Sequence, residues 1–488
     1  MDEPLSPSLP DGARMHRFDP AMERVAHHIV LYALERIRLD PPPLDHPRRP
    51  DELDRLGSTI TPAGIGGMEA LELFCEHLAP ATISQDHPRN VAFVPCAPTE
   101  AAVLFDLVVG ASSIFGGSWM EGAGAVWAEN QALRWLADLA GFPGSAGGVF
   151  VSGGTAGNLS ALVAARSRAM RRWDAAGGCR PRRWVLAASD GAHSSIAAAA
   201  RVMDVDVLRV PTDKTGHMRG DALHTVLHDA ISRGTQAAPD AEADAGLFAI
   251  VATGGTTNAG MIDDLSGAAD AAEEHGLWLH VDGAYGAAAL VAPSVRSRFW
   301  GIERADSFVV DPHKWLFAPY DCAALIYRDP AIAAEAHTQH AGYLEVLHDP
   351  GEWNPSDYAF HLTRRARGLP FWYSLATHGT DAYRDAVETS LALTREIAAV
   401  IRADPDLDLL LEPELSVVLF RRRGWSAAQY DAWSDRMLAE QRAFCVPTTV
   451  APTGPDGSGE RETVLRFCIT HPRTTLDDLC EILDSLHL

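Results

Sequence analysis

The sequence predicts an α/β protein built around a largely parallel sheet with helices on both faces. From about residue 90 to residue 329, short apolar runs of strand type alternate with amphipathic helical segments. Such alternation is typical of parallel sheets, whose strands are buried on both faces. The chain has 488 residues, which suffices for one large domain and smaller additional parts.

The first part, residues 1–85, is predicted to be an N-terminal helical segment. Residues 21–39 carry apolar side chains at helical spacing, and the prolines at 41–43 interrupt this pattern. A second helical stretch at residues 68–78 follows the glycines of GIGG. The apolar face of the first helix must find a packing partner.

The large domain is predicted at residues 86–375. Its strands correspond to seven apolar runs, at residues 148–152, 184–189, 205–211, 247–253, 277–282, 307–311 and 322–327. Helices are expected between several of them, for example at 159–173 and 265–275. Because ligands of such sheets bind beyond the carboxyl ends of the strands, functional residues are expected where these runs end.

The remaining chain is predicted to contain a long loop and a small C-terminal α+β domain. Residues 329–357 lack clear periodicity, and a loop of this length is typically a lid or a disordered segment. The small domain, residues 376–488, follows the start of a long helical region. Strands are expected near 416–420 and 464–469, and a last helix at 475–486.

Composition excludes several classes of function. The formal net charge is −24, so nucleic acid and anionic membranes would repel the chain, and we expect neither as a partner. We expect the basic runs at 364–365 and 421–423 to be solvated faces or anion contacts. No membrane span or secretory signal is expected. The seven cysteines form no CxxC pair. This pattern favours a cytoplasmic location and argues against a disulfide framework and a structural zinc site.

Lysine is rare in this chain, with Lys214 and Lys314 as the two examples. Arginine stays protonated and cannot act as an amine nucleophile, so chemistry that needs a primary amine has two candidates. Lys214 lies in a polar turn. Lys314 lies in DPHKW, after an apolar run and beside a tryptophan. Desolvation there is expected to lower the pKa of Lys314 and make it a nucleophile.

Three further clusters follow expected strands. The segment SGGTAGN at 152–158 joins a strand to a helix, where glycines and free N–H groups suit an anion, although many such turns bind nothing. His193 is either a catalytic group or a structural hydrogen-bonding residue. Asp282 ends an apolar run, and it either pairs with a cation such as a protonated ring nitrogen or caps the next turn.

Taken together, these groups predict a site for pyridoxal 5′-phosphate. The glycine loop would hold the phosphate, Asp282 would pair with the pyridinium nitrogen, and His193 would lie against the ring. Lys314 would bind the cofactor covalently as a Schiff base. No metal is expected.

The chain resembles the group II pyridoxal-phosphate decarboxylases, which include aromatic-L-amino-acid, histidine and glutamate decarboxylases. The segments that carry the resemblance lie between residues 115 and 369, among them FVSGGTAGNLSALVAAR, SDGAHSSI, LWLHVDGAYG and ADSFVVDPHKWLFAPYDCAAL. The pairing of HVDGAYG with DPHKW at this distance is the most specific feature. The resemblance implies the aspartate-aminotransferase-like fold, fold type I, in a homodimer with active sites at the interface.

The resemblance also implies roles for individual residues. Lys314, His193, Tyr343 and Asp282 would be catalytic, and Tyr343 would belong to a mobile loop. The residues that would contact the cofactor include three of the catalytic residues and the neighbours of the phosphate and the ring. They are Gly154, Thr155, His193, Thr257, Asp282, Ala284, His313 and Lys314. Many relatives have Asn at the position of Asp311, where an aspartate would repel phosphate, so we expect Asp311 to point elsewhere or to bind through another group.

The implied reaction is decarboxylation of an L-amino acid to its amine and CO₂. Tyr343 or His193 is the expected proton donor to the former α-carbon. An aromatic substrate is expected, because Phe93 and Trp119 could line an apolar pocket, although both are equally compatible with a core position. The alternatives are a non-aromatic substrate, another outcome on the same fold (an aldehyde synthase, aminotransferase or aldolase-type lyase), or an inactive binding protein.

Overall fold

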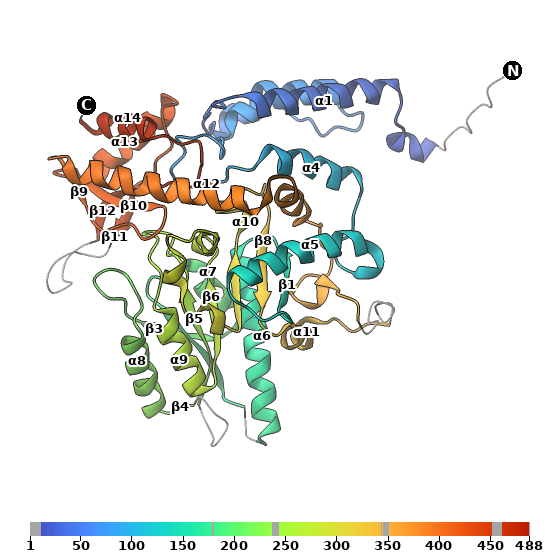
Figure 1. The fold of residues 1–488 in the computed structure, drawn as a ribbon. Coiled ribbons are helices and arrows are strands. Elements are labelled where there is room, and N and C mark those ends of the chain that lie inside the picture. The colour runs from blue at the N-terminus through green and yellow to red at the C-terminus, as the bar shows by residue number, and fades with distance from the viewer. Residues whose placement is uncertain are drawn as a thin grey trace.

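The central sheet is the organising element of the structure, a computed structural model that describes residues 11–177, 180–236, 244–342, 344, 351–450 and 461–487. Within these residues its strands have the order β1-β8-β7-β6-β5-β2-β3, with the two-residue β4 beside β5 (Figure 1). Their bounds are β1 Gly147–Val151, β2 Arg183–Ser189, β3 Asp206–Val210, β4 Thr235–Gln236, β5 Ala245–Thr253, β6 Trp278–Asp282, β7 Ser307–Val310 and β8 Ala323–Tyr327.

The pairing of the strands confirms the predicted, mostly parallel sheet. β8 is antiparallel to both of its neighbours, β1 and β7, and the other described pairs in the sheet are parallel. Since β8 reverses direction between them, β1 and β7 point the same way. The carboxyl ends of β1, β5, β6 and β7 therefore meet at one edge. Each of the seven predicted runs overlaps one of the strands.

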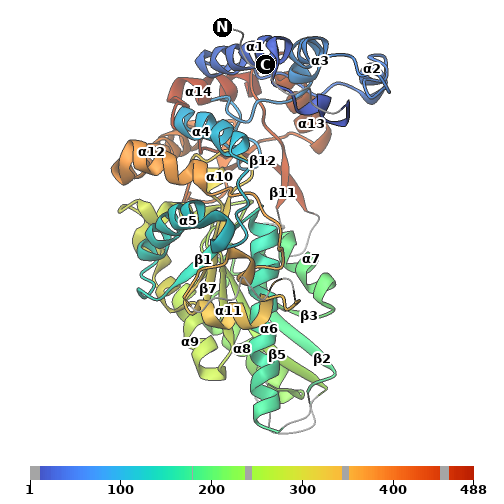
Figure 2. The ribbon, with the colours of Figure 1, turned by 90° about the vertical axis from the view of Figure 1, so that its right-hand side faces the viewer.

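Helices cover both faces of the sheet because side chains of a strand point alternately to opposite faces. In β1, Phe150 belongs to one apolar core, and Val149 and Val151 belong to the other. Figure 2 shows α5 and α9 on one side of the sheet and α6 and α7 on the other. The helix bounds are α4 Glu100–Ala111, α5 Trp119–Leu139, α6 Gly154–Ala175, α7 Ser194–Met203, α8 Gly220–Ser232, α9 Leu265–His275, α11 Pro330–His337 and α12 Leu369–Ala403.

Capping residues explain where two of these helices begin and end. Asp264 accepts a hydrogen bond from the Gly267 N–H at the start of α9, and Gly276 ends the helix with φ 63°. At α11, Asp329 accepts from the Ala331 N–H, and Pro330 occupies the first turn. The expectation of a loop from residue 329 was therefore wrong at its start, because the helix is too short for its periodicity to be recognised.

The N-terminal and C-terminal parts lie together above the sheet in Figure 1. Helices α1 (Pro20–Arg38), α2 (Pro50–Asp54) and α3 (Gly67–Leu73) form the N-terminal part. The C-terminal sheet is antiparallel, in the order β11-β12-β10-β9, and packs with α13 and α14. Its elements are β9 Leu407–Leu409, β10 Val417–Arg422, α13 Ala427–Ala439, β11 Thr448–Val450, β12 Glu462–Cys468 and α14 Leu476–Asp484. The two strands and the last helix predicted here are present.

Helix α12 connects the two larger parts. It crosses the predicted domain boundary at residues 375–376 and contributes to the cores on both sides. Gly379, with φ 75°, is non-helical inside it. No helix within the described residues is long and apolar enough to span a membrane. The described cysteines are all free.

The basic pair at residues 364–365 was expected to be a solvated face or an anion contact, and the structure excludes a solvated face for Arg364. Arg364 is fully buried and bonds Glu129 of α5 at 2.8 Å, and Glu129 is itself only 2% exposed. The same carboxylate accepts a hydrogen bond from the Gly368 N–H, just before α12. Arg365 is more exposed and pairs with Asp106. The Arg364–Glu129 pair therefore ties the start of α12 to α5.

We predict that Arg364→Ala destabilises the protein far more than its neighbour Arg365→Ala. Removing Arg364 leaves a buried, uncompensated Glu129 carboxylate, which typically costs about 3–5 kcal/mol. Removing the half-exposed Arg365 should cost less than about 1 kcal/mol. Urea denaturation of both variants measures the difference, and equal shifts would contradict the structural role given to the buried pair.

Candidate active site

A cavity of about 280 Å³ lies at the carboxyl edge of the central sheet. It is lined by residues that follow β1, β2, β5, β6 and β7, in agreement with the general rule for such sheets. Among the lining residues are all but one of the predicted site residues, namely Gly154, Thr155, His193, Thr257, Asp282, Ala284, His313 and Lys314. Tyr343, the remaining one, lies outside the described residues.

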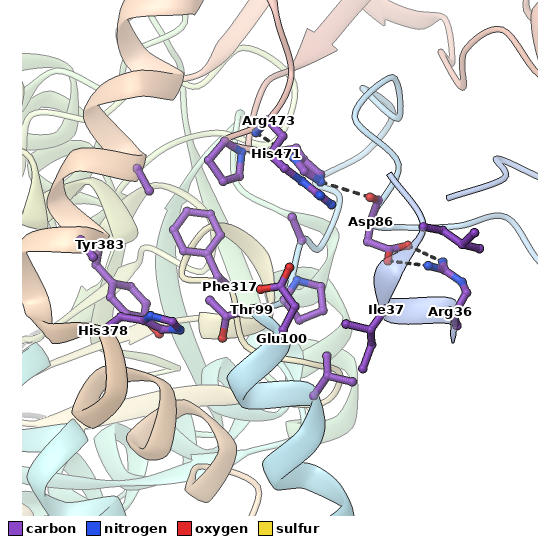
Figure 3. Close-up of a pocket in the computed structure, with 17 residues that line it drawn as sticks. Arg36, Ile37, Asp86, Thr99, Glu100, Phe317, His378, Tyr383, His471 and Arg473 are labelled. Carbon is purple, nitrogen blue, oxygen red and sulfur yellow. Dashed lines mark hydrogen bonds and ion pairs between the residues drawn. The ribbon is translucent and has the colours of Figure 1, made fainter. Parts of the chain in front are cut away.

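A second cavity, of about 550 Å³, is larger but carries different chemistry (Figure 3). It lies between α1, α4, α12 and residues 471–473. Three of its polar residues are bonded to one another: Arg36 pairs with Asp86 at 2.8 Å, and His471 bonds the Asp86 carbonyl. Neither lysine of the chain lines it. The smaller cavity is therefore the candidate active site.

Asp282 is held in position by a buried amide. The side chain ends β6 and is 5% exposed. Its Oδ2 accepts a hydrogen bond of 2.9 Å from Asn158 Nδ2, and its Oδ1 accepts one of 3.2 Å from the Ala284 N–H. Asn158 lies one helical turn after Gly154 on α6, so both face the cavity. These donors orient a carboxylate that burial alone would disfavour.

Behind Asn158, a chain of hydrogen bonds fixes the state of His280. His280 Nε2 lies 2.8 Å from Asn158 Oδ1, which can only accept, so Nε2 carries the proton. His280 Nδ1 then accepts from Ser307 Oγ at 2.8 Å, and Ser307 Oγ accepts from Trp278 Nε1. Burial lowers the pKa of His280 to about 4, despite the nearby Asp282. His280 therefore stays neutral and fixes which end of the Asn158 amide faces Asp282.

His193 joins the same network from the opposite side. It caps α7, where its Nδ1 accepts from the Ser195 N–H at 3.2 Å and lies 2.9 Å from Ser195 Oγ. Ser195 Oγ in turn accepts from Asn158 Nδ2. A neutral His193 consequently carries its proton on Nε2. The predicted structural and catalytic roles of His193 are thus compatible, because capping uses only Nδ1.

The N-terminus of α6 also lines the cavity. Gly154 begins this 22-residue helix without a side-chain cap, and an added Cβ would lie 2.8 Å from Ala284 Cβ. His313 Nδ1 accepts from the Cys322 N–H at 2.9 Å, so a neutral ring presents its Nε2–H on the cavity side, 3.6 Å from Asp311. Burial lowers the pKa of His313 and keeps it neutral. Helix N–H groups and this donor suit a phosphate.

Asp311 lines the cavity, so the first of the two expectations, that it points elsewhere, is wrong, and the second, that it binds through another group, stays a prediction. Its side chain is buried, and its Oδ2 accepts from the Gly154 N–H at 3.2 Å. The same oxygen lies 2.9 Å from Lys314 Nζ. Both positions belong to the short helix turn after β7, where a spacing of three residues brings the two side chains together.

This ion pair also reverses the predicted pKa shift of Lys314. Burial is the largest single effect and lowers the pKa, as expected, but the charge and hydrogen bond of Asp311, together with the charge of Asp282, raise it and reverse the net direction. The pKa of Lys314 therefore lies above its ordinary value. Lys214, by contrast, is exposed.

The residues fit pyridoxal phosphate in several respects. The cavity offers a lysine amine, a carboxylate with fixed orientation, and a helix N-terminus whose N-cap is a glycine and that admits no side chain at Gly154. The carboxylate and the helix N-terminus come from different strand ends, because Asp282 ends β6 and Gly154 follows β1. These are the groups that the ring nitrogen, the aldehyde and the phosphate of this cofactor require.

Comparisons with known proteins agree with this geometry. The family model described as pyridoxal-dependent decarboxylase conserved domain matches residues 70–423, well over half of the chain. The chain belongs to the pyridoxal-dependent decarboxylase family. It is therefore a pyridoxal-phosphate-dependent amino-acid decarboxylase, and the expected family and cofactor are confirmed.

Individual relatives cover most of the decarboxylase. It is 29% identical over 440 residues to an aromatic-L-amino-acid decarboxylase of Bacillus atrophaeus, covering 88% of this chain and 87% of the relative. It is 31% identical over 388 residues to that of Sus scrofa, covering 76% and 77%. A crystal structure of Oryza sativa TDC with PLP and tryptamine has a TM-score of 0.82 at 23% identity, with 99% of both chains covered. The last comparison confirms the fold.

Sequence reasoning missed several residues of the decarboxylase site. Asn158 and His280 could have been found, because one lies a helical turn after Gly154 and the other two residues before Asp282 on the same strand face. Arg466 had no such signal. From β12, it donates to the carbonyls of Phe93 and Thr257 at 2.6 and 2.8 Å. Phe93 and Trp119, proposed as pocket residues, do not line the cavity.

We predict that Asp282→Asn folds and binds cofactor but loses most turnover. A neighbouring carboxylate favours a protonated ring nitrogen by roughly 1–3 pKa units, so kcat should fall by about 10- to 1000-fold. Asp263→Asn is the matched control, since this aspartate is similarly buried, accepts from the main-chain N–H groups of Met218 and Thr253, and lies outside the cavity. Normal kcat in Asp282→Asn, or equal losses in both, would assign Asp282 a structural role.

Proposed function

We propose that this enzyme decarboxylates an aromatic L-amino acid to the corresponding amine and CO₂, with Lys314 as the residue that binds the cofactor. The carrying observation is that one cavity brings together the amine of Lys314 and the oriented carboxylate of Asp282. The aromatic preference is supported by the two relatives named above, which are aromatic-L-amino-acid decarboxylases.

Each part of the cavity has a proposed task. When bound, pyridoxal phosphate supplies an electron sink for the bond that breaks. Asp282, oriented by Asn158, keeps a proton on the ring nitrogen. Gly154, Thr155 and His313 hold the phosphate end. Ala284 packs against one face of the ring, and Thr257 lies near its hydroxyl side; both residues line the cavity.

Two side chains are proposed to manage protons at the former α-carbon. His193 lines the cavity and holds a transferable proton on Nε2 while Nδ1 stays bonded to Ser195. Tyr343 offers a phenol proton. We assign the final protonation to Tyr343, and His193, which the family resemblance places against the ring, is the alternative donor.

A homodimer with active sites at the interface is also proposed. No residue of α1 is buried within the single chain, although the helix has a clear apolar face. Its exposed apolar side chains include Met22, Ile29, Val30 and Leu31. Such a surface is typical of an interface between subunits.

The proposed reaction is tested by incubating the cofactor-loaded protein with each common L-amino acid. CO₂, amine, aldehyde and peroxide are measured in parallel. We predict equal amounts of CO₂ and amine, and a kcat/KM for an aromatic substrate at least roughly tenfold above that for other amino acids. Preference for a non-aromatic substrate would overturn the substrate class, and aldehyde in place of amine would favour an aldehyde synthase.

The same assay on Tyr343→Phe tests the proton donor. Phenylalanine keeps the shape but lacks the phenol proton, so CO₂ release should persist while product shifts towards aldehyde under air, with peroxide formed from dioxygen. Unchanged amine production without peroxide would make His193 the better candidate. Lys214→Ala serves as a control that leaves all products unchanged.

A further inference from the structure

Asp311 shares the groups that the proposed function assigns to the cofactor phosphate. Its Oδ2 accepts from the Gly154 N–H at the start of α6 and lies 2.9 Å from Lys314 Nζ. The proposed phosphate donor His313 is 3.6 Å away through its Nε2. A phosphate held by the same N–H and imidazole groups must therefore lie beside a carboxylate.

Within the part of the chain that the structure describes, the second oxygen of Asp311 has no hydrogen-bond partner. Oδ1 is buried and receives no hydrogen bond in the structure, although the whole residue is only 1% exposed. A buried carboxylate oxygen without a donor is costly. A protonated carboxyl group would instead turn this position into a donor that can reach an adjacent acceptor.

The main chain leaves Asp311 little freedom to turn away. Its N–H donates to the Ala284 carbonyl at 2.9 Å, and its carbonyl accepts from the Lys314 N–H at 2.9 Å. The side chain is short and enclosed. Two negative groups in contact inside a cavity disfavour each other's ionised forms. Loss of one charge is therefore expected when a phosphate dianion enters.

The other titratable groups around Asp311 do not supply that compensation. Burial keeps His313 neutral by lowering its pKa, and it raises the pKa of Tyr320 and of Cys322 well above their usual ranges. Asp282, facing from β6, adds negative charge. In the structure, Lys314 compensates Asp311 as a free ammonium, and the proposed function commits that amine to a bond with the cofactor.

We propose that Asp311 couples binding of the cofactor phosphate to the uptake of one proton from solvent. The carboxylate becomes a carboxylic acid, and its O–H donates to a phosphate oxygen. Cofactor affinity is then reduced as pH rises, by up to tenfold per pH unit relative to a protein without this carboxylate. This inference rests on the proposed site but concerns cofactor binding, not the reaction.

The test is titration calorimetry of the cofactor-free protein with two probes, pyridoxal phosphate and pyridoxal, which lacks the phosphate. Wild type and Asp311→Asn are compared at several pH values between about 6 and 8.5. Two buffers of different ionisation enthalpy, without phosphate or primary amines, allow the protons taken up to be counted.

We expect Asp311→Asn to bind pyridoxal phosphate at least roughly tenfold more tightly at pH 7.5, with nearly one proton fewer taken up. The affinity for pyridoxal should increase much less in the same variant. Equal gains for both probes would show that Asp311 acts only through the Lys314 amine, and unchanged affinity and proton count would also overturn the proposal.

Failure of wild type to bind the cofactor and failure of the variant to fold each have their own consequence. If wild type fails to bind pyridoxal phosphate, the proposed cofactor site fails along with this inference. If Asp311→Asn does not fold by circular dichroism, wild type alone decides: uptake of about one more proton with pyridoxal phosphate than with pyridoxal supports the coupling, and equal proton counts overturn it.

Discussion

The hydrogen bond from Asn158 to Asp282 is the interaction on which the site depends. A carboxylate at the end of a fully buried strand is expensive unless donors and charge compensate it. Asn158 satisfies one oxygen, and the main chain at Ala284 satisfies the other. Because the amide is held by His280 on its carbonyl side, it cannot turn without losing three buried hydrogen bonds. The parallel sheet brings these groups together from two segments, around residue 158 and residues 280–284, that are distant in sequence.

The cavity holds two carboxylates, Asp282 and Asp311, and the ammonium of Lys314 lies beside Asp311. Asp282 faces the position proposed for the ring nitrogen, and Asp311 faces that proposed for the phosphate. The raised pKa of Lys314 shows that the ammonium is stabilised by both charges. Activation of this lysine as a nucleophile therefore requires its carboxylate neighbour to be compensated in another way. Lysine reactivity and phosphate binding are coupled through one side chain.

Much of this arrangement could be predicted from the sequence, because the functional residues follow apolar runs that had to be strands. Parallel strands end at the same edge, so Gly154, Asp282 and Lys314 were expected to meet. The Asn158 network was not foreseen, since it depends on the register that pairs His280 with Ser307 and on the rotation of α6. The pKa of Lys314 was predicted in the wrong direction because burial was considered without the distance to Asp311.

The central claim is that Lys314 binds the cofactor. It is tested most directly by borohydride reduction of the cofactor-loaded protein, followed by proteolysis and mass spectrometry. Because the chain has two lysines, the pyridoxyl group can be attached to one of two lysine-containing peptides. The account predicts a pyridoxyl group on the peptide that contains Lys314 and none on the peptide that contains Lys214. Modification of Lys214, or of neither lysine, would contradict it.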